Sequence, residues 1–342
     1  MSSTVSEGGL EFHYDDSDIT LRSSDHVDYH VHKIILSTSS PFFKSMFSLP
    51  QPNASVSEMH HPIVDMPENS AIVHSLLAFI YPVVSDAPEF ASLDEIMDAF
   101  AAAKKYDMAV ASRRLNRQFA KSLFIKYNPV VAFCAAYSRK LGDAACIAAK
   151  ASLKYPMNLD KIAEKLQHID GAAFYQLYKF HRACSATAAE AVTGTRLTWI
   201  TKSDCAWWDL ANTRCASKCS TYSYRLALDP QEVRSTFTPV YTPSEPIWVA
   251  STPYHNFITH AQSVLLEHPC QEAVTAYHFL DPFYKEKVCD NCQLTLRGLP
   301  EFSRLLGEEV ERRVSEVGHH DNIFHQHITQ LSPLKVELEL PF

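Results

Sequence analysis

The sequence predicts an α+β protein, with a short β-sheet flanked by helices near the N-terminus and a mostly helical chain after it. Two observations support this prediction. Apolar and polar residues alternate over residues 18–22 and again over 25–32, which is the pattern of half-buried strands. Beyond residue 69 the apolar residues recur every three or four positions, as they do on one face of an amphipathic helix.

The first two strands are expected to form a hairpin. Ile19 and Leu21 share one face of the first strand, and Val27, Tyr29 and Val31 share one face of the second. The connector RSSD is rich in residues that favour turns.

Two short helices should follow the hairpin. Residues 33–39, KIILSTS, contain a compact apolar cluster. Ser40 before Pro41 is a helix start, because serine is a good N-cap and proline is favoured at the first helical position. The apolar residues of the second helix fall on one face: Phe42, Phe43, Met46 and Phe47. We expect the three phenylalanines in the core, since large aromatic side chains are most often buried; a contribution to a partner-binding surface is the alternative.

The chain then continues with a strand and a series of helices. Residues 61–67, HPIVDMP, are expected as a short buried strand, and a helix with a regular apolar face should end near Pro82. Ser92 and Glu95 form a capping box for the next helix. The pattern stays helical to about residue 183, with helix starts at Asn128-Pro129 and Gly142-Asp143.

Composition excludes several classes of function. The formal net charge of −8 argues against nucleic acid or an anionic membrane as a partner. The sequence has no glycine-rich phosphate loop and no apolar run long enough to span a membrane. The N-terminus lacks a secretory signal pattern, so we expect a cytoplasmic or nuclear protein. Its nine cysteines are then expected as reduced thiols or metal ligands rather than disulfides.

Several motifs in this order resemble the BTB (POZ) domain. They are the strand SDITL, the segment YHVHKIILSTSSPFFKSMF, the helix that ends in FIY, and the block AAAKKYD. The resemblance covers residues 15–125 and is closest to the large fungal family of BTB-domain proteins. It implies a BTB fold followed by a helical extension similar to a BACK domain.

The resemblance also implies partners and site residues. BTB domains form homodimers, and many bind the scaffold of a cullin-type ubiquitin ligase or a transcriptional corepressor. Asp18 and Lys33 stand where dimeric members have a charged pocket, in which a buried carboxylate needs a paired cation; a surface pair of little energetic value is the alternative. Val56 to Glu58 fits the hydrophobic–x–Glu element that cullin-binding relatives use.

Residues 104–126 are expected to form a basic helix. They contain seven Lys or Arg and one Asp. Arg113, Arg117 and Lys121 recur every four residues on one face, whereas Leu115, Phe119 and Leu123 recur on another. A docking face for an acidic partner is one interpretation, and an ordinary solvated helix face is the other.

The C-terminal part contains two cysteine pairs, Cys215 with Cys219 and Cys289 with Cys292. A tetrahedral zinc site would need the two pairs to meet although about 70 residues separate them, which is longer than an ordinary zinc ribbon. Buried thiols without metal are the alternative. We therefore expect no cofactor other than this candidate zinc ion.

These observations predict a non-enzymatic adaptor that self-associates through its BTB domain and recruits a target to a cullin-type ubiquitin ligase. The alternative is a transcription-associated regulator with a zinc-stabilised C-terminal region. No catalytic residue set can be singled out, because catalytic triads are defined by geometry rather than by sequence distance. The expected division of the chain is a disordered N-terminus (1–14), the BTB domain (15–125), a helical extension (126–184), a linker (185–196), a mostly helical Cys- and Trp-containing region (197–318) and a tail (319–342).

Overall fold

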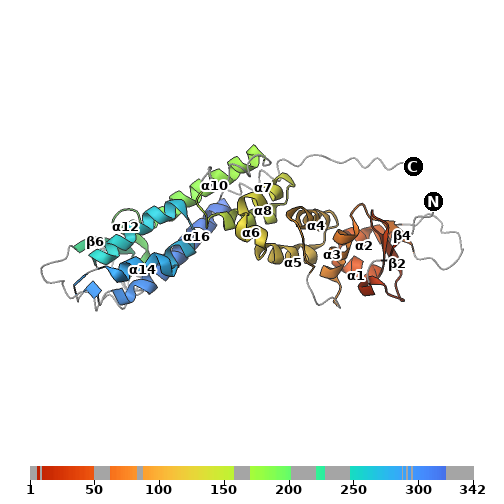
Figure 1. Ribbon diagram of the computed structural model, residues 1–342, viewed down its shortest axis with the longest axis horizontal. Helices are drawn as coiled ribbons and strands as arrows, with labels where there is room; N and C mark the ends of the chain where they lie inside the picture. The colour runs from red at the N-terminus through yellow and green to blue at the C-terminus, as the bar shows by residue number, and fades with distance from the viewer. Residues whose placement is uncertain are drawn as a thin grey trace, which may run out of the picture. The chain divides into compact units, whose positions relative to one another are not determined.

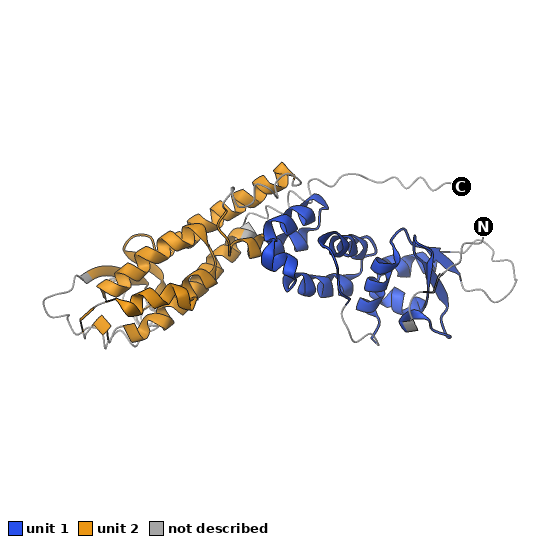
Figure 2. Cartoon of the chain, in the orientation of Figure 1, with its two compact units in different colours: residues 1–148 blue, residues 149–342 orange. Residues whose placement is uncertain are grey.

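The computed structural model divides into two compact units, residues 1–148 and 149–342 (Figure 2). None of the described helices is long and apolar enough to cross a membrane. The structure describes residues 6–7, 10–49, 62–82, 88–157, 170–201, 221–227, 247–286, 288–289, 292–293 and 296–320.

A four-stranded sheet, in the order β1-β3-β2-β4, lies near the N-terminus of unit 1 (Figure 1). The expected hairpin is confirmed: β2 and β3 are antiparallel, with Ile19 opposite Val31. The outer strands β1 and β4 each run parallel to their neighbour. The strands are β1 (Ser6–Glu7), β2 (Ile19–Arg22), β3 (Val27–Val31) and β4 (Ile63–Asp65).

Two expectations for this sheet are wrong. Strand β4 is not buried: it is an outer strand, and the side chain of Ile63 is 49% exposed. Residues 10–14, expected to be disordered, are ordered against the sheet. Phe12, in the short 3-10 helix η1 (Leu10–Phe12), is fully buried and contacts the rings of Tyr29 and Tyr81. Tyr14 adds a second contact, since its ring stacks on that of Tyr81, so buried aromatic contacts hold the segment against the sheet.

Three helices pack next to the sheet: α1 (Lys33–Ser39), α2 (Pro41–Ser48) and α3 (Ser70–Ile80). The junction between the first two helices is as the sequence predicts. The Ser40 hydroxyl accepts a hydrogen bond from the Phe43 backbone N–H at 3.1 Å and donates one to the Tyr106 carbonyl at 2.5 Å. Ser40 therefore caps one helix and ties it to the end of another.

The rest of unit 1 is helical, with α4 (Leu93–Lys105), α5 (Ala109–Ala120), α6 (Leu123–Tyr127), α7 (Pro129–Ser138) and the start of α8 (Gly142–Ser152). The expected capping box is present in part: Ser92 accepts from the Glu95 N–H, but the Glu95 carboxylate accepts from Ala91 rather than from Ser92. The expectation of a single basic helix over 104–126 is wrong. The chain turns after Lys105, where Asp107 has a φ of 49°, and a new helix, α6, begins after Ser122.

Unit 2 packs helices with a second, three-stranded sheet in the order β5-β6-β7. The sequence analysis predicted no strands there. Strands β5 and β6 are parallel, whereas β6 and β7 are antiparallel. The elements are the end of α8, α10 (Gly171–Glu190), β5 (Arg196–Thr201), β6 (Thr221–Ala227), β7 (Ile247–Ser251), α12 (Thr252–Glu267), α13 (Gln271–Thr275), α14 (Tyr277–Lys285), the 3-10 helix η3 (Leu296–Gly298) and α16 (Leu299–His320).

The expected linker, residues 185–196, is mostly structured. Helix α10 continues to Glu190, and Ala188 and Ala189 in its last turn are buried. Small residues indicated a linker from the sequence, but they are what a helix needs where it packs closely against its neighbours. Helix α10 packs along both α12 and α16.

An aromatic cluster forms the core of unit 2. The Phe302 ring contacts those of Trp248, Tyr254 and Phe257, at centroid distances of 5.5–5.7 Å. Trp199 joins the cluster from β5. Trp199 is half-buried in this core, whereas Trp207 and Trp208 lie outside the described residues.

Candidate interaction site

The joint between β3 and α1 holds the most recognisable motif of the sequence. Asp18, at the start of β2, accepts a hydrogen bond from the Lys33 backbone N–H at 2.7 Å. The first N–H groups of a helix have no partner within the helix, and a carboxylate there also interacts favourably with the helix dipole. Asp18 therefore caps α1 from a neighbouring strand.

The charged pocket expected from Asp18 and Lys33 is not formed within one chain. Asp18 is exposed rather than partly buried, and its described contact is with the backbone of Lys33, not with the ammonium group. The lysine side chain is half-buried. A pocket formed between two copies of the chain therefore stays a prediction.

His32 occupies the same joint. Its ring nitrogens lie 3.1 Å from the Tyr81 hydroxyl and 3.1 Å from Asp16. The hydrogen bond from His32 lowers the pKa of the Asp16 carboxyl. Burial raises the pKa of Tyr81, which keeps this phenol neutral. The half-buried His32 thus links Asp16 and Tyr81 at the start of α1.

The aromatic face of α2 is divided between core and surface. Phe43 is 1% exposed, and its ring stacks on those of Phe47 and Tyr106. Met46 and Phe47 are half-buried, and Phe42 is 43% exposed. The core expectation is therefore right for Phe43, partly right for Phe47 and wrong for Phe42. Eight residues of helix turn through more than two turns, so positions one residue apart cannot all face the sheet.

Large apolar side chains are exposed on α1, on α2 and directly after α2. Ile34 in the first turn of α1 is 71% exposed, and Leu49 at the end of α2 is 65% exposed. Together with Phe42 they form what we call the α1–α2 apolar face. An isolated exposed Leu or Ile is ordinary, but three large ones on two consecutive short helices make a surface suited to another protein. Sequence reasoning missed Ile34, because KIILSTS does not reveal which of its isoleucines faces the sheet.

A partly buried polar contact links the end of α4 to Glu68, in the loop before α3. The Tyr106 hydroxyl donates to Glu68 at 2.5 Å, and the Lys105 ammonium lies 2.9 Å from the same carboxylate. Burial, reinforced by the hydrogen bond to Glu68, raises the pKa of Tyr106. The contact ties the end of α4 to the loop before α3, so it is structural.

The basic face lies on α5. Arg113, Arg117 and Lys121 are all exposed, while Leu115 and Phe119 are fully buried, as predicted. Leu123 does not continue the buried row, since 67% of its side chain is exposed. The helix break at Ser122 resets the helical phase and moves Leu123 from the core to the surface.

The zinc hypothesis receives no support from the described residues. Among them, no group of three or more His, Cys, Asp or Glu side chains is arranged to hold a metal ion. Cys292 is buried and Cys289 half-buried. Cys215 and Cys219 lie outside the part of the chain that the structure describes, as do Val56 and Glu58 of the cullin element. The Cys₄ site and that element therefore stay predictions.

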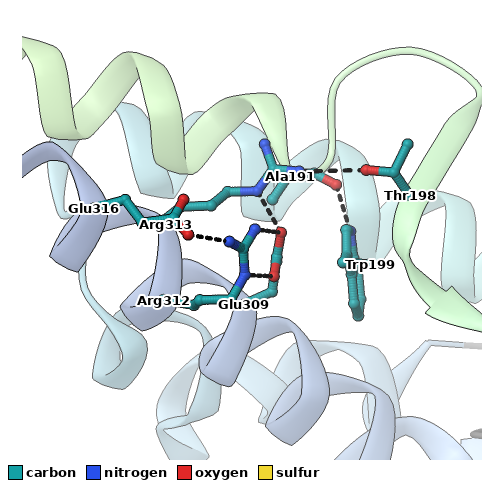
Figure 3. A network of polar contacts seen from close by, with 7 residues as sticks. All are labelled: Ala191, Thr198, Trp199, Glu309, Arg312, Arg313 and Glu316. Carbon is teal, nitrogen blue, oxygen red and sulfur yellow. Dashed lines mark hydrogen bonds and ion pairs between the residues drawn. The ribbon is translucent and has the colours of Figure 1, made fainter. Parts of the chain in front are cut away.

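Unit 2 contains a polar network that fixes β5 to α16 (Figure 3). Glu309, only 8% exposed, receives hydrogen bonds from both Arg312 and Arg313 at 2.5–2.8 Å. Burial alone would raise the pKa of Glu309, but the two arginines outweigh it and hold the pKa below its usual range. In β5, the Trp199 indole N–H donates to the carbonyl of Ala191, directly after α10, at 2.7 Å.

Unit 2 also has a surface cavity of about 680 Å³ along α10 and the end of α12. Its lining includes His181, whose imidazole is buried and lies 3.2 Å from the Tyr155 carbonyl. Cys184, one turn further along α10, is fully buried, and burial raises the pKa of its thiol to about 12. A thiol with so high a pKa is a poor nucleophile, so Cys184 is not an activated cysteine.

Unit 1 combines a small sheet and helices with exposed apolar side chains on α1 and α2 and an exposed basic row on α5. Comparison with protein families agrees, since residues 10–123, about a third of the chain, match the BTB/POZ domain. This part of the chain is a BTB domain, a module that generally binds proteins rather than catalysing reactions. No curated protein matches the chain.

Proposed function

We propose that this protein is an adaptor that self-associates through its BTB domain. The observation that carries the proposal is the α1–α2 apolar face, on a domain of a family whose members oligomerise. Ile34 adjoins Lys33, so the apolar face and the proposed charged pocket are continuous along the chain. Burying Ile34 against a second copy would remove a large apolar side chain from water, which is worth about 1.5–3 kcal/mol for each such residue.

The charged pocket is proposed to form between the two copies, where Asp18 of one chain meets Lys33 of the other. Asp18 already caps α1 in the single chain, so its carboxylate is held in place before association. An exposed ion pair is worth little, but the same pair becomes stronger when an interface excludes water. We expect the pair to contribute to the affinity of the dimer as well as to its orientation.

Sedimentation of the full chain tests self-association. The wild-type protein is expected to sediment as a dimer and the Ile34→Asp variant as a monomer. Ile247→Asp is a matched control, because Ile247 is 67% exposed but lies in unit 2. A monomeric wild-type protein at high concentration, or equal effects of the two substitutions, would refute the proposal.

The pocket can be tested separately from the helix cap. Asp18→Asn retains an oxygen that can accept the Lys33 N–H but loses the charge. It should weaken self-association with little loss of stability, and the charge-swapped double variant D18K/K33D should recover part of the association. If D18N associates as tightly as wild type, Asp18 acts only as a cap.

We further propose that the adaptor belongs to the large fungal family of BTB proteins and brings a target, bound by unit 2, to a cullin-type ubiquitin ligase. Support comes from the BTB match and from a second unit with its own aromatic core and surface cavity. Purified cullin N-terminal domain and a corepressor peptide should each be titrated into the full chain. Binding of the cullin domain supports the proposal; binding of the corepressor peptide alone would favour a transcriptional role.

A further inference from the structure

The basic face of α5 has a chemical character unlike the rest of unit 1. Between Met108 and Lys126 the sequence contains five Lys or Arg residues and no Asp or Glu, although the whole chain carries a net charge of −8. The helix therefore carries a local positive charge on a protein whose net charge is negative.

Several other basic side chains of unit 1 have a polar partner. Arg22 lies 2.7 Å from Asp28, Arg139 lies 2.7 Å from Asp94, and Arg114, next to the basic face on α5, donates to the Phe79 carbonyl at 2.7 Å. In contrast, Arg113, Arg117 and Lys121 form no ion pair or side-chain hydrogen bond with any described residue, and all three are exposed. The charges on this face are therefore available to a partner.

Two exposed apolar side chains follow the basic face in the chain, beyond the end of α5. Leu123 and Tyr127 lie four residues apart on α6, and their side chains are 67% and 63% exposed. Residues four apart share one face of a helix. Basic and apolar groups thus follow one another within a few residues of chain.

We propose that the basic face of α5, with Leu123 and Tyr127 of α6, is a docking site for an acidic protein segment that also carries large apolar residues. Cations four residues apart on a helix are about 6 Å apart along its axis. Acidic side chains at alternate positions of an extended segment have nearly the same spacing, about 6.5 Å. The site therefore favours a peptide with acidic residues at every second position, followed by apolar ones.

Two other partner classes fit less well. A membrane-surface helix inserts its apolar face into lipid, but the apolar face of α5, Leu115 and Phe119, is fully buried within unit 1. Single-stranded nucleic acid needs aromatic platforms among the cations, whereas the exposed Tyr127 of the proposed site follows the basic row instead of lying between its cations. The inference concerns a surface distinct from the α1–α2 apolar face and does not depend on self-association.

The test is fluorescence anisotropy with the full chain and a short fluorescein-labelled peptide that has Glu at alternate positions followed by two Leu. The triple variant R113E/R117E/K121E should lower the affinity at least about tenfold at low ionic strength, since each lost attraction becomes a repulsion. If this variant fails to fold, R113Q/R117Q/K121Q replaces it. The affinity for wild type should fall as salt is added.

The control triple, K44E/K179E/R182E, reverses three exposed cations elsewhere and changes the net charge by the same amount. It should alter the affinity less than about twofold. Leu123→Ser in the protein should weaken binding of this peptide. It should not weaken binding of a second peptide in which both Leu residues are replaced by Ser. Equal losses in the two triples, or no binding of the acidic peptide, would overturn the proposal. So would tighter binding of a single-stranded oligonucleotide or of phosphatidylserine vesicles.

Discussion

The Tyr81 hydroxyl accepts a hydrogen bond from the backbone N–H of His32, with the oxygen 2.8 Å from the nitrogen. Tyr81 follows α3 and is 2% exposed, while His32 immediately precedes α1. The Tyr14 ring stacks on Tyr81 at 5.4 Å. One buried phenol thus connects the end of α3, the start of α1 and the N-terminal segment.

Tyr81→Phe should lower the free energy of unfolding by about 1–3 kcal/mol, because it leaves the His32 N–H without its partner. Denaturant titration of the full chain measures the change. Tyr127→Phe is the control, since 63% of that side chain is exposed, and it should be close to neutral. If both substitutions have equal effects, the hydrogen bond contributes nothing.

Asp18→Ala should lower the free energy of unfolding by about 0.5–2 kcal/mol, because α1 loses the acceptor of the Lys33 N–H. The loss is again read from denaturant titration. Asp15→Ala removes a neighbouring exposed carboxylate and should have little effect. A neutral Asp18→Ala would show that water replaces the cap.

Glu309→Gln should destabilise unit 2 by about 2 kcal/mol, because two arginines lose their charged acceptor. Glu316→Gln, at a carboxylate 56% exposed, should cost less than about 0.5 kcal/mol. Because the pKa of Glu309 is held low, its contribution is present above the unfolded pKa and disappears as the pH falls through the folded one. The wild-type protein should therefore lose this advantage over Glu309→Gln below about pH 4.

His181 should make unit 2 less stable in mild acid. Burial lowers the pKa of this imidazole, so the unfolded chain binds the proton more readily than the folded one. The free energy of unfolding is therefore unaffected by His181 above the pKa of an unfolded histidine, about 6.5. It falls as the pH drops from there toward the lower pKa of the folded state. His181→Gln should flatten the dependence of the thermal midpoint on pH below about 6.5; an unaltered dependence would contradict this.

The sequence predicted unit 1 well where one local rule decides the structure. Alternation placed β2 and β3, and Ser40-Pro41 placed the start of α2. It failed where burial depends on distant partners. Nothing around Ile63 shows that β4 is an outer strand, and Leu123 fits a regular apolar row until a helix break moves it to the surface.

Unit 2 was harder to predict because its strands are far apart in sequence. Strand β6 pairs with β5 and β7, so no short hairpin pattern reveals the sheet. The network around Glu309 joins residues more than 100 positions apart, since Arg313 lies 3.5 Å from Thr198. Of the candidate site, the sequence pattern predicts the basic row, but only the structure shows that Arg113, Arg117 and Lys121 have no ion-pair partner among the described residues.

The sheet of unit 1 ends in two very short strands, with two residues in β1 and three in β4. Long open strand edges pair with other chains and lead to aggregation. Edges this short offer few unpaired backbone groups, so a domain that meets other proteins is protected from indiscriminate strand addition. Selectivity then rests with side chains on its helices, where single substitutions can change the partner without endangering solubility.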